Sequence, residues 1–177
     1  MSAGPDPVVP RFPAGKAPLP SDFNTWIQAP FTFLTTKVMF RAQYEGTLSL
    51  TGDAFTKIPY DTILEDPYDG WDATNHTWMA PTGCTGWYEV TMTAFADEFG
   101  TDHDTIQAVL YLDGALYAQP SGIWGAEGHS TGCCAQVDLP MTGGFDYISG
   151  YIFVSTTVDT TGETGQYPTI EVVWISL

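Results

Sequence analysis

The chain has 177 residues, which is enough for one domain and a short appendage. Its formal net charge is −16, and no Lys or Arg follows Lys57, so the sequence excludes a protein that binds nucleic acid through its phosphates. It also lacks the run of about eighteen apolar residues that a membrane span needs, and its N-terminus lacks the pattern of a secretory leader. These features predict a protein made in the cytoplasm or released by lysis.

The charge divides the chain into two parts. Residues 1–57 hold all five basic residues and four acidic ones, a sum of +1, and the remaining 17 acidic residues give residues 58–177 a charge of −17. Such acidity favours solubility. It is equally compatible with a near-neutral anchor that carries an acidic head.

The first segment, residues 1–36, is predicted to be an extended anchoring arm. Six prolines in residues 1–20 disfavour helix. A short helix is expected from the N-cap Ser21 to Pro30, and it is too short to be stable alone. We expect the apolar residues of the arm to become buried on a partner; they are Phe12, Phe23, Trp26, Ile27, Phe31 and Phe33.

Residues 37–177 are predicted to form an all-β domain, an antiparallel sandwich or jelly roll without helical crossovers. In Trp87–Phe95, residues alternate between a face with Glu89, Thr91 and Thr93 and an apolar face, and Asp113-Gly114 is a two-residue hairpin signal. The expected strands are Lys37–Tyr44, Thr47–Thr51, Lys57–Leu64, Trp87–Phe95, Ile106–Leu112, Ala115–Ala118, Ala135–Leu139, Tyr147–Ser155 and Ile170–Leu177.

The order of these segments resembles the C1q/TNF-like jelly roll, in the divergent form found in bacteriophage structural proteins. The residues that carry the resemblance are Phe40–Gln43, Ile58–Asp66, Gly70–Asp72, Trp78–Pro81, Thr85–Val90, Val137–Pro140, Phe145–Ile148 and Ile170–Leu177. The arm resembles lead-in segments of virion proteins of actinobacterial phages. The resemblance implies a homotrimer; the family's calcium residues are not identifiable in this chain, so none is carried over.

Two clusters could carry chemistry, and for both a structural role is the preferred interpretation. Gly128–Gly132 fits the pattern around a nucleophilic serine, but Ser130 is followed by a strand instead of the helix that such a site requires. The segment Asp97–Asp104 has oxygen ligands suited to Ca²⁺ without EF-hand spacing. The cysteines Cys84, Cys133 and Cys134 are expected to be buried free thiols, because an odd number does not form a disulfide framework.

The leading hypothesis is therefore a virion structural protein, with no enzymatic activity and no cofactor. It would form a trimeric module on the virion surface, as a head decoration or head fibre, and attach through its arm to major capsid or tail proteins. The alternative is a tail-tip or tail-fibre head that binds a glycan of the host cell surface through Trp71, Trp78 or Trp124. A hydrolase that uses Ser130 or the carboxylates of Asp97–Asp104 is the third hypothesis.

Overall fold

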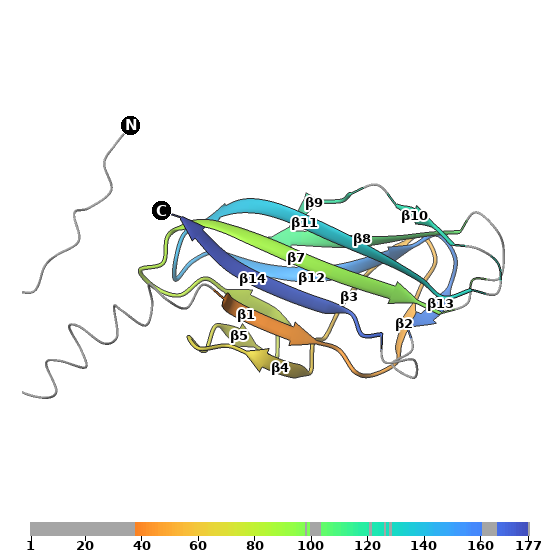
Figure 1. The fold of residues 1–177 in the computed structure, drawn as a ribbon, viewed down its shortest axis with the longest axis horizontal. Helices are drawn as coiled ribbons and strands as arrows, with labels where there is room; N and C mark the ends of the chain where they lie inside the picture. Colours follow the sequence, from red (N-terminus) through yellow and green to blue (C-terminus); the bar gives the residue numbers. More distant parts are fainter. Residues whose placement is uncertain are drawn as a thin grey trace, which may run out of the picture. The chain divides into compact units, whose positions relative to one another are not determined.

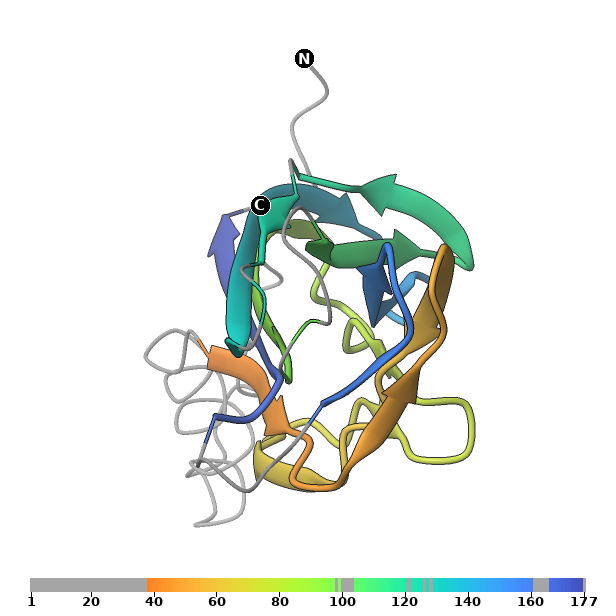
Figure 2. The same ribbon diagram turned by 90° about the vertical axis from the view of Figure 1, so that its right-hand side faces the viewer.

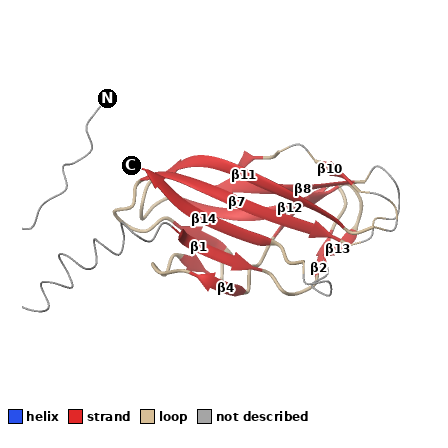
Figure 3. Ribbon diagram, viewed as in Figure 1, coloured by secondary structure: helices blue, strands red, loops and turns tan. Residues whose placement is uncertain are grey.

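A computed structural model of the chain describes residues 38–97, 99, 104–120, 122–125, 127, 129–160 and 166–176. All regular structure among them is β-strand, as predicted. Figure 3 shows these strands in red. No helix in this described part is long and apolar enough to cross a membrane. The predicted arm, its helix and its six apolar residues lie outside the described residues.

Two antiparallel sheets form the domain, here called the head (residues 38–176; Figure 1). The five-stranded sheet has the order β11-β7-β14-β1-β4, and the seven-stranded sheet contains β10-β8-β12-β6-β5, with β3 paired to β12 and β9 to β8. A small third sheet pairs β13 with β2. The strands are β1 Val38–Gln43, β2 Leu48–Leu50, β3 Ala54–Lys57, β4 Thr62–Glu65, β5 Trp71–Asp72, β6 Thr77–Met79, β7 Gly86–Ala96, β8 Thr105–Leu112, β9 Ala115–Ala118, β10 Ile123–Trp124, β11 Thr131–Met141, β12 Tyr147–Val154, β13 Val158–Thr160 and β14 Thr169–Ser176.

The core lies between the two large sheets, which Figure 2 shows facing each other. The alternation predicted for β7 is confirmed, because Tyr88, Val90, Met92 and Ala94 are at most 1% exposed while the residues between them point outward. From the opposite sheet, Ile106, Ala108, Leu110, Ile148 and Ile152 fill the same space. This burial of apolar side chains from both sheets is the main stabilising contribution to such a sandwich.

The hairpin between β8 and β9 is confirmed at Asp113-Gly114. Both residues have positive φ angles, 51° and 76°, which matches the twist of the flanking strands. The Asp113 carboxylate also accepts a hydrogen bond from the N–H of Tyr147 at 3.0 Å, so the turn is attached to the start of β12.

The prediction of one strand over Lys57–Leu64 is wrong. β3 pairs with β12 of the seven-stranded sheet, whereas β4 pairs with β1 of the five-stranded sheet. Residues 58–61 cross from one sheet to the other, and Pro59 within them has no N–H to contribute to a ladder. The crossing places Ile58 and Tyr60 in the core, at 0% and 2% exposure.

Candidate functional site

A cavity of about 690 Å³ lies over the outward face of the seven-stranded sheet. Its floor includes Met79 of β6, Tyr147 and Tyr151 of β12, and Lys57 of β3. Its walls come from the turn before β5, the turn between β5 and β6, and the loop that follows β6. The volume is in the range of ligand-binding pockets, about 300–1,000 Å³.

Strand register brings the floor residues together. Tyr147 is paired with Met79, and Tyr151 is paired with Lys57 across the β12–β3 ladder. Tyr147, Ser149 and Tyr151 alternate along β12, so all three line the outward side, while Ile148 and Ile152 point into the core. The floor is therefore a set of aromatic rings held by a rigid sheet.

The turn between β5 and β6 supplies the polar wall. The Asp72 carboxylate accepts hydrogen bonds from the N–H groups of Thr74 (2.8 Å) and Asn75 (3.1 Å), and from the Asn75 side-chain amide (2.6 Å). The hydrogen bond from the Asn75 side-chain amide has the largest effect, and together these bonds hold the pKa of Asp72 below its ordinary value. The carboxylate thus stays ionised at neutral pH.

Lys57 is the cation of the cavity. Its ammonium group donates a hydrogen bond to the Asn75 carbonyl at 2.6 Å and lies 5.8 Å from the centre of the Tyr151 ring. Desolvation by the surrounding walls lowers the pKa of Lys57, an effect that the negative charge of Asp72 opposes. The side chain therefore links the floor to the polar wall.

A layer of stacked aromatic rings supports the cavity from the core side. Trp71 stacks on Phe40 with ring centres 5.2 Å apart, and Phe40 stacks on Trp78 at 5.9 Å. The Asp66 carboxylate accepts hydrogen bonds from the N–H groups of Gly70 (3.0 Å) and Trp71 (2.9 Å). Gly70 has no room for a side chain, since a Cβ there would lie 2.6 Å from the Met79 carbonyl oxygen.

Aromatic side chains continue beyond the cavity along the same sheet face. Tyr111 lies 4.2 Å from Tyr151, ring centre to ring centre, and Phe55 lies 6.2 Å from Tyr111 and 5.3 Å from Phe153. Phe55 is 41% exposed, so this aromatic row is open to solvent at its far end.

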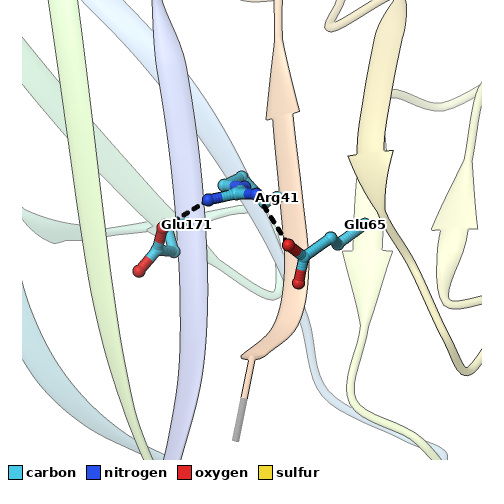
Figure 4. A network of polar contacts seen from close by, with 3 residues as sticks. All are labelled: Arg41, Glu65 and Glu171. Atoms are coloured by element: carbon cyan, nitrogen blue, oxygen red, sulfur yellow. Dashed lines mark hydrogen bonds and ion pairs between the residues drawn. The ribbon is translucent and has the colours of Figure 1, made fainter. Parts of the chain in front are cut away.

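The outward face of the five-stranded sheet has a different character. Arg41 of β1 lies between two carboxylates on neighbouring strands, Glu65 at 2.6 Å and Glu171 at 3.9 Å (Figure 4). All three side chains are about 40% exposed (39–43%), so solvent screens these ion pairs, and each stabilises the fold by about 0–1 kcal/mol. The network orders the surface and offers no site for chemistry.

The three tryptophans of the glycan hypothesis lie in different environments. Trp71 lines the cavity. Trp78 is fully buried against Phe40 and Tyr88 and has no exposed surface on which a sugar could stack. Trp124 is 66% exposed in β10, an edge strand that pairs with the start of β8, and it does not line the cavity. The structure thus does not bring the three together.

Of the clusters considered for catalysis, the structure describes Ser130 and three residues of the Asp97–Asp104 segment. Ser130 is exposed and donates a hydrogen bond to Asp97 at 3.3 Å, and it leads into β11 instead of a helix. Asp104 is 7% exposed and accepts hydrogen bonds from Ser155 and Thr156, while residues 98 and 100–103 of the proposed calcium segment lie outside the described part. Within that part no group of three or more His, Cys, Asp or Glu could hold a metal ion.

The prediction for the cysteines is confirmed for two of three. Cys84 and Cys133 are buried, and all three are free thiols, but Cys134 is exposed. Neighbouring residues of a strand point to opposite faces, so the Cys133-Cys134 pair cannot be buried on one side of β11. Burial raises the pKa of Cys133 to about 12.

Sequence reasoning missed Lys57, Met79, Tyr147 and Tyr151 as site residues. One signal was available. Tyr147, Ser149, Tyr151 and Phe153 alternate with apolar residues along a predicted strand, which places three aromatic rings on its second face. The partners on β3 and β6 depend on strand pairing, which the pattern does not reveal.

No model of a known protein family matches the sequence, and no curated protein matches it either. Many solved chains are similar in fold, among them the following three. The globular domain of zebrafish complement 1qA protein covers 79% of this chain and 98% of its own, at 11% identity and a TM-score of 0.52. PRD1 vertex protein P5 covers 80% of this chain and 74% of its own, at 12% identity and a TM-score of 0.53. Eiger TNF from S. frugiperda covers 80% and 94%, at 15% identity and a TM-score of 0.46.

The head is thus a C1q/TNF-like jelly roll, which confirms the predicted fold class. None of the three proteins is named as an enzyme.

Proposed function

We propose that the chain is a structural protein of a virus surface, in which the jelly-roll head assembles as a homotrimer and residues 1–36 anchor it to the particle. A head decoration or head fibre of a bacteriophage with an actinobacterial host is the specific role we favour. The observation that carries the proposal is the fold, which the head shares with a protein named for its place at the vertex of PRD1.

The end of the head at which β1 begins supports anchoring through the N-terminal segment. β1 begins there at Val38, whose partner in β14 is Val173. At the same end Trp87 and Ile175 are each 46% exposed, and Phe145, in the turn that follows β11, is 75% exposed. A group of exposed apolar side chains at one end of a domain is typical of a contact surface. The end at which residues 1–37 join the head therefore has the character of a docking face.

The charge of the head fits a domain that is exposed on the surface of a particle. Only two basic residues, Arg41 and Lys57, lie in the described part, and both contact oxygen atoms of the head itself. A surface so rich in carboxylates repels nucleic acid and keeps neighbouring assembled trimers apart. Such a surface suits a module that projects from a particle at high local density.

The test is reconstitution on virus particles that lack the protein. We expect full-length protein to sediment as a trimer and to attach at symmetric positions visible by electron cryomicroscopy. A full-length variant with Phe23, Trp26 and Ile27 changed to Ser should stay trimeric and lose attachment. The matched control changes Ile123 and Trp124, which are exposed in β10, to Ser and should attach normally.

Two results would contradict the proposal. A protein that stays monomeric at micromolar concentration would contradict the proposed homotrimer. Attachment of the arm variant at normal occupancy would show that the head itself makes the contact.

A further inference from the structure

The chemistry that lines the cavity on the seven-stranded sheet restricts what it can bind. Of the ionisable residues around it, Lys57 contributes one positive charge, and Asp69 and Asp72 contribute two negative ones. The ammonium group of Lys57 already donates to the Asn75 carbonyl. A phosphate or sulfate group would meet two carboxylates and only one, partly satisfied, cation, so this lining disfavours anions.

The floor favours a flat ligand with one apolar face. Tyr147 and Tyr151 present partly exposed rings on the same side of β12, and the Met79 side chain, 42% exposed, lies beside Tyr147. Rings of this kind bury apolar surface at low cost in side-chain entropy. The wall above them holds oriented acceptors and donors, namely the Asp72 carboxylate and the Asn75 amide.

A sugar ring combines these two requirements, because the C–H groups of one face are apolar and the hydroxyl groups at its edge donate and accept hydrogen bonds. A peptide strand would bind through its backbone along a sheet edge, whereas the rings and the methionine that form this floor lie on a sheet face. We propose that the cavity is a binding site for a neutral, pyranose-containing glycan, with a sugar ring held on Tyr147, Met79 and Tyr151 and its hydroxyls bonded by Asp72 and Asn75.

The aromatic row would allow the site to bind a glycan of more than one sugar unit. Tyr111 lies against Tyr151 at 4.2 Å, and Phe55 and Phe153 follow on the same face, so further sugar units would contact rings outside the cavity. The glycan site and the exposed apolar residues Trp87 and Ile175 belong to different sheets. The observations that favour a glycan in the cavity involve neither the proposed trimer nor particle attachment.

Methionine methyl NMR on the full chain tests the site directly. Met79 lines the cavity, whereas Met39, Met92 and Met141 are at most 2% exposed in the core. With ¹³C-methyl methionine, and with Met79→Leu to assign the signal, neutral tetrasaccharides of glucose, N-acetylglucosamine, galactose and mannose are titrated to about 10 mM, the range of weak single-site binding. We expect at least one of them to shift the Met79 signal saturably and to leave the three core signals unchanged.

Variants then separate stacking from non-specific effects. Tyr151→Ala and Tyr147→Ala should each weaken binding about tenfold, and Tyr151→Phe, which keeps the ring, should bind within about threefold of the original chain. The matched control is Tyr117→Ala, a 41% exposed tyrosine of β9 outside the cavity, and it should bind unchanged.

Three outcomes would overturn the proposal. These are no saturable Met79 shift with any neutral tetrasaccharide, unchanged binding by both alanine variants, or tighter binding of a tetragalacturonate than of every neutral probe. Sedimentation of the same samples shows whether the trimer persists, so loss of the glycan site is distinguishable from failure of the proposed assembly.

Discussion

Replacing Tyr60 by Phe should stabilise the protein. Tyr60 is 2% exposed in the segment that crosses between the sheets, and its hydroxyl is buried without a hydrogen-bond partner among the described residues. A buried hydroxyl without a partner costs about 1–3 kcal/mol relative to its hydration in the unfolded chain. Removing it leaves a gap of only one atom, so we expect the free energy of unfolding to rise by about 1–2 kcal/mol.

The position of Gly150 allows the same hydroxyl to be tested a second way. A Cβ on Gly150 would lie 2.6 Å from the Tyr60 hydroxyl oxygen and 3.0 Å from the Met92 sulfur. Gly150→Ala should therefore destabilise the head by about 1–3 kcal/mol through overpacking. In the Tyr60→Phe background the closest contact is gone, so the cost should fall by about 1 kcal/mol.

Urea unfolding at fixed protein concentration, followed by tryptophan fluorescence, measures all four members of this cycle. Tyr88→Phe is the matched control, because the Tyr88 hydroxyl donates to the Cys84 carbonyl and its loss should destabilise the protein by about 1 kcal/mol. The reasoning is refuted if Tyr60→Phe lowers stability by more than about 1 kcal/mol, or if the two substitutions are additive within about 0.5 kcal/mol.

Three further predictions concern proteolysis, thiols and pH. Trypsin should leave a fragment that begins at Val38, since the two basic residues of the described part lie in paired strands; mass spectrometry that finds cleavage after Lys57 under native conditions would contradict this. Of the three thiols only Cys134 should react within minutes with Ellman's reagent at pH 8, and Cys134→Ser should abolish that phase. Burial raises the pKa of the Cys133 thiol from 9.0 to about 12, so the contribution of the thiol to stability is complete below about pH 9 and is lost as the pH rises toward 12. The free energy of unfolding of Cys133→Ala should therefore fall less steeply between pH 9 and 12 than that of the original chain.

The sequence predicts the parts of this fold that local patterns determine. β7 has a period of two over its whole length, and Asp113 and Gly114 tolerate the positive φ angles that the hairpin turn requires. Strands of two or three residues, such as β5 and β6, contain too few side chains to show a period. β6 depends on pairing with β12, a segment far away in the chain, and β5 in turn pairs with β6.

The error over Lys57–Leu64 has the same origin. An alternating pattern marks which side chains are buried, but it does not mark the sheet to which each half of the segment belongs. Predicting the site from residue types alone failed for a similar reason. Tryptophan suggested sugar contact, yet Trp78 is a core residue, while the exposed rings of Tyr147 and Tyr151 are recognised only once the register with β6 and β3 is known.

The position of β1 has a mechanical consequence. This strand is hydrogen-bonded on both sides, to β14 and to β4, and its N-terminal residue Val38 is where residues 1–37 join the head. A pull on those residues along the strand axis loads both ladders in shear, so their hydrogen bonds share the force instead of breaking one after another. A head held by its N-terminal segment would therefore withstand tension along β1 far better than a pull at right angles to it, which would open the ladder with β14 from the Val38–Val173 pair onward, one hydrogen bond after another.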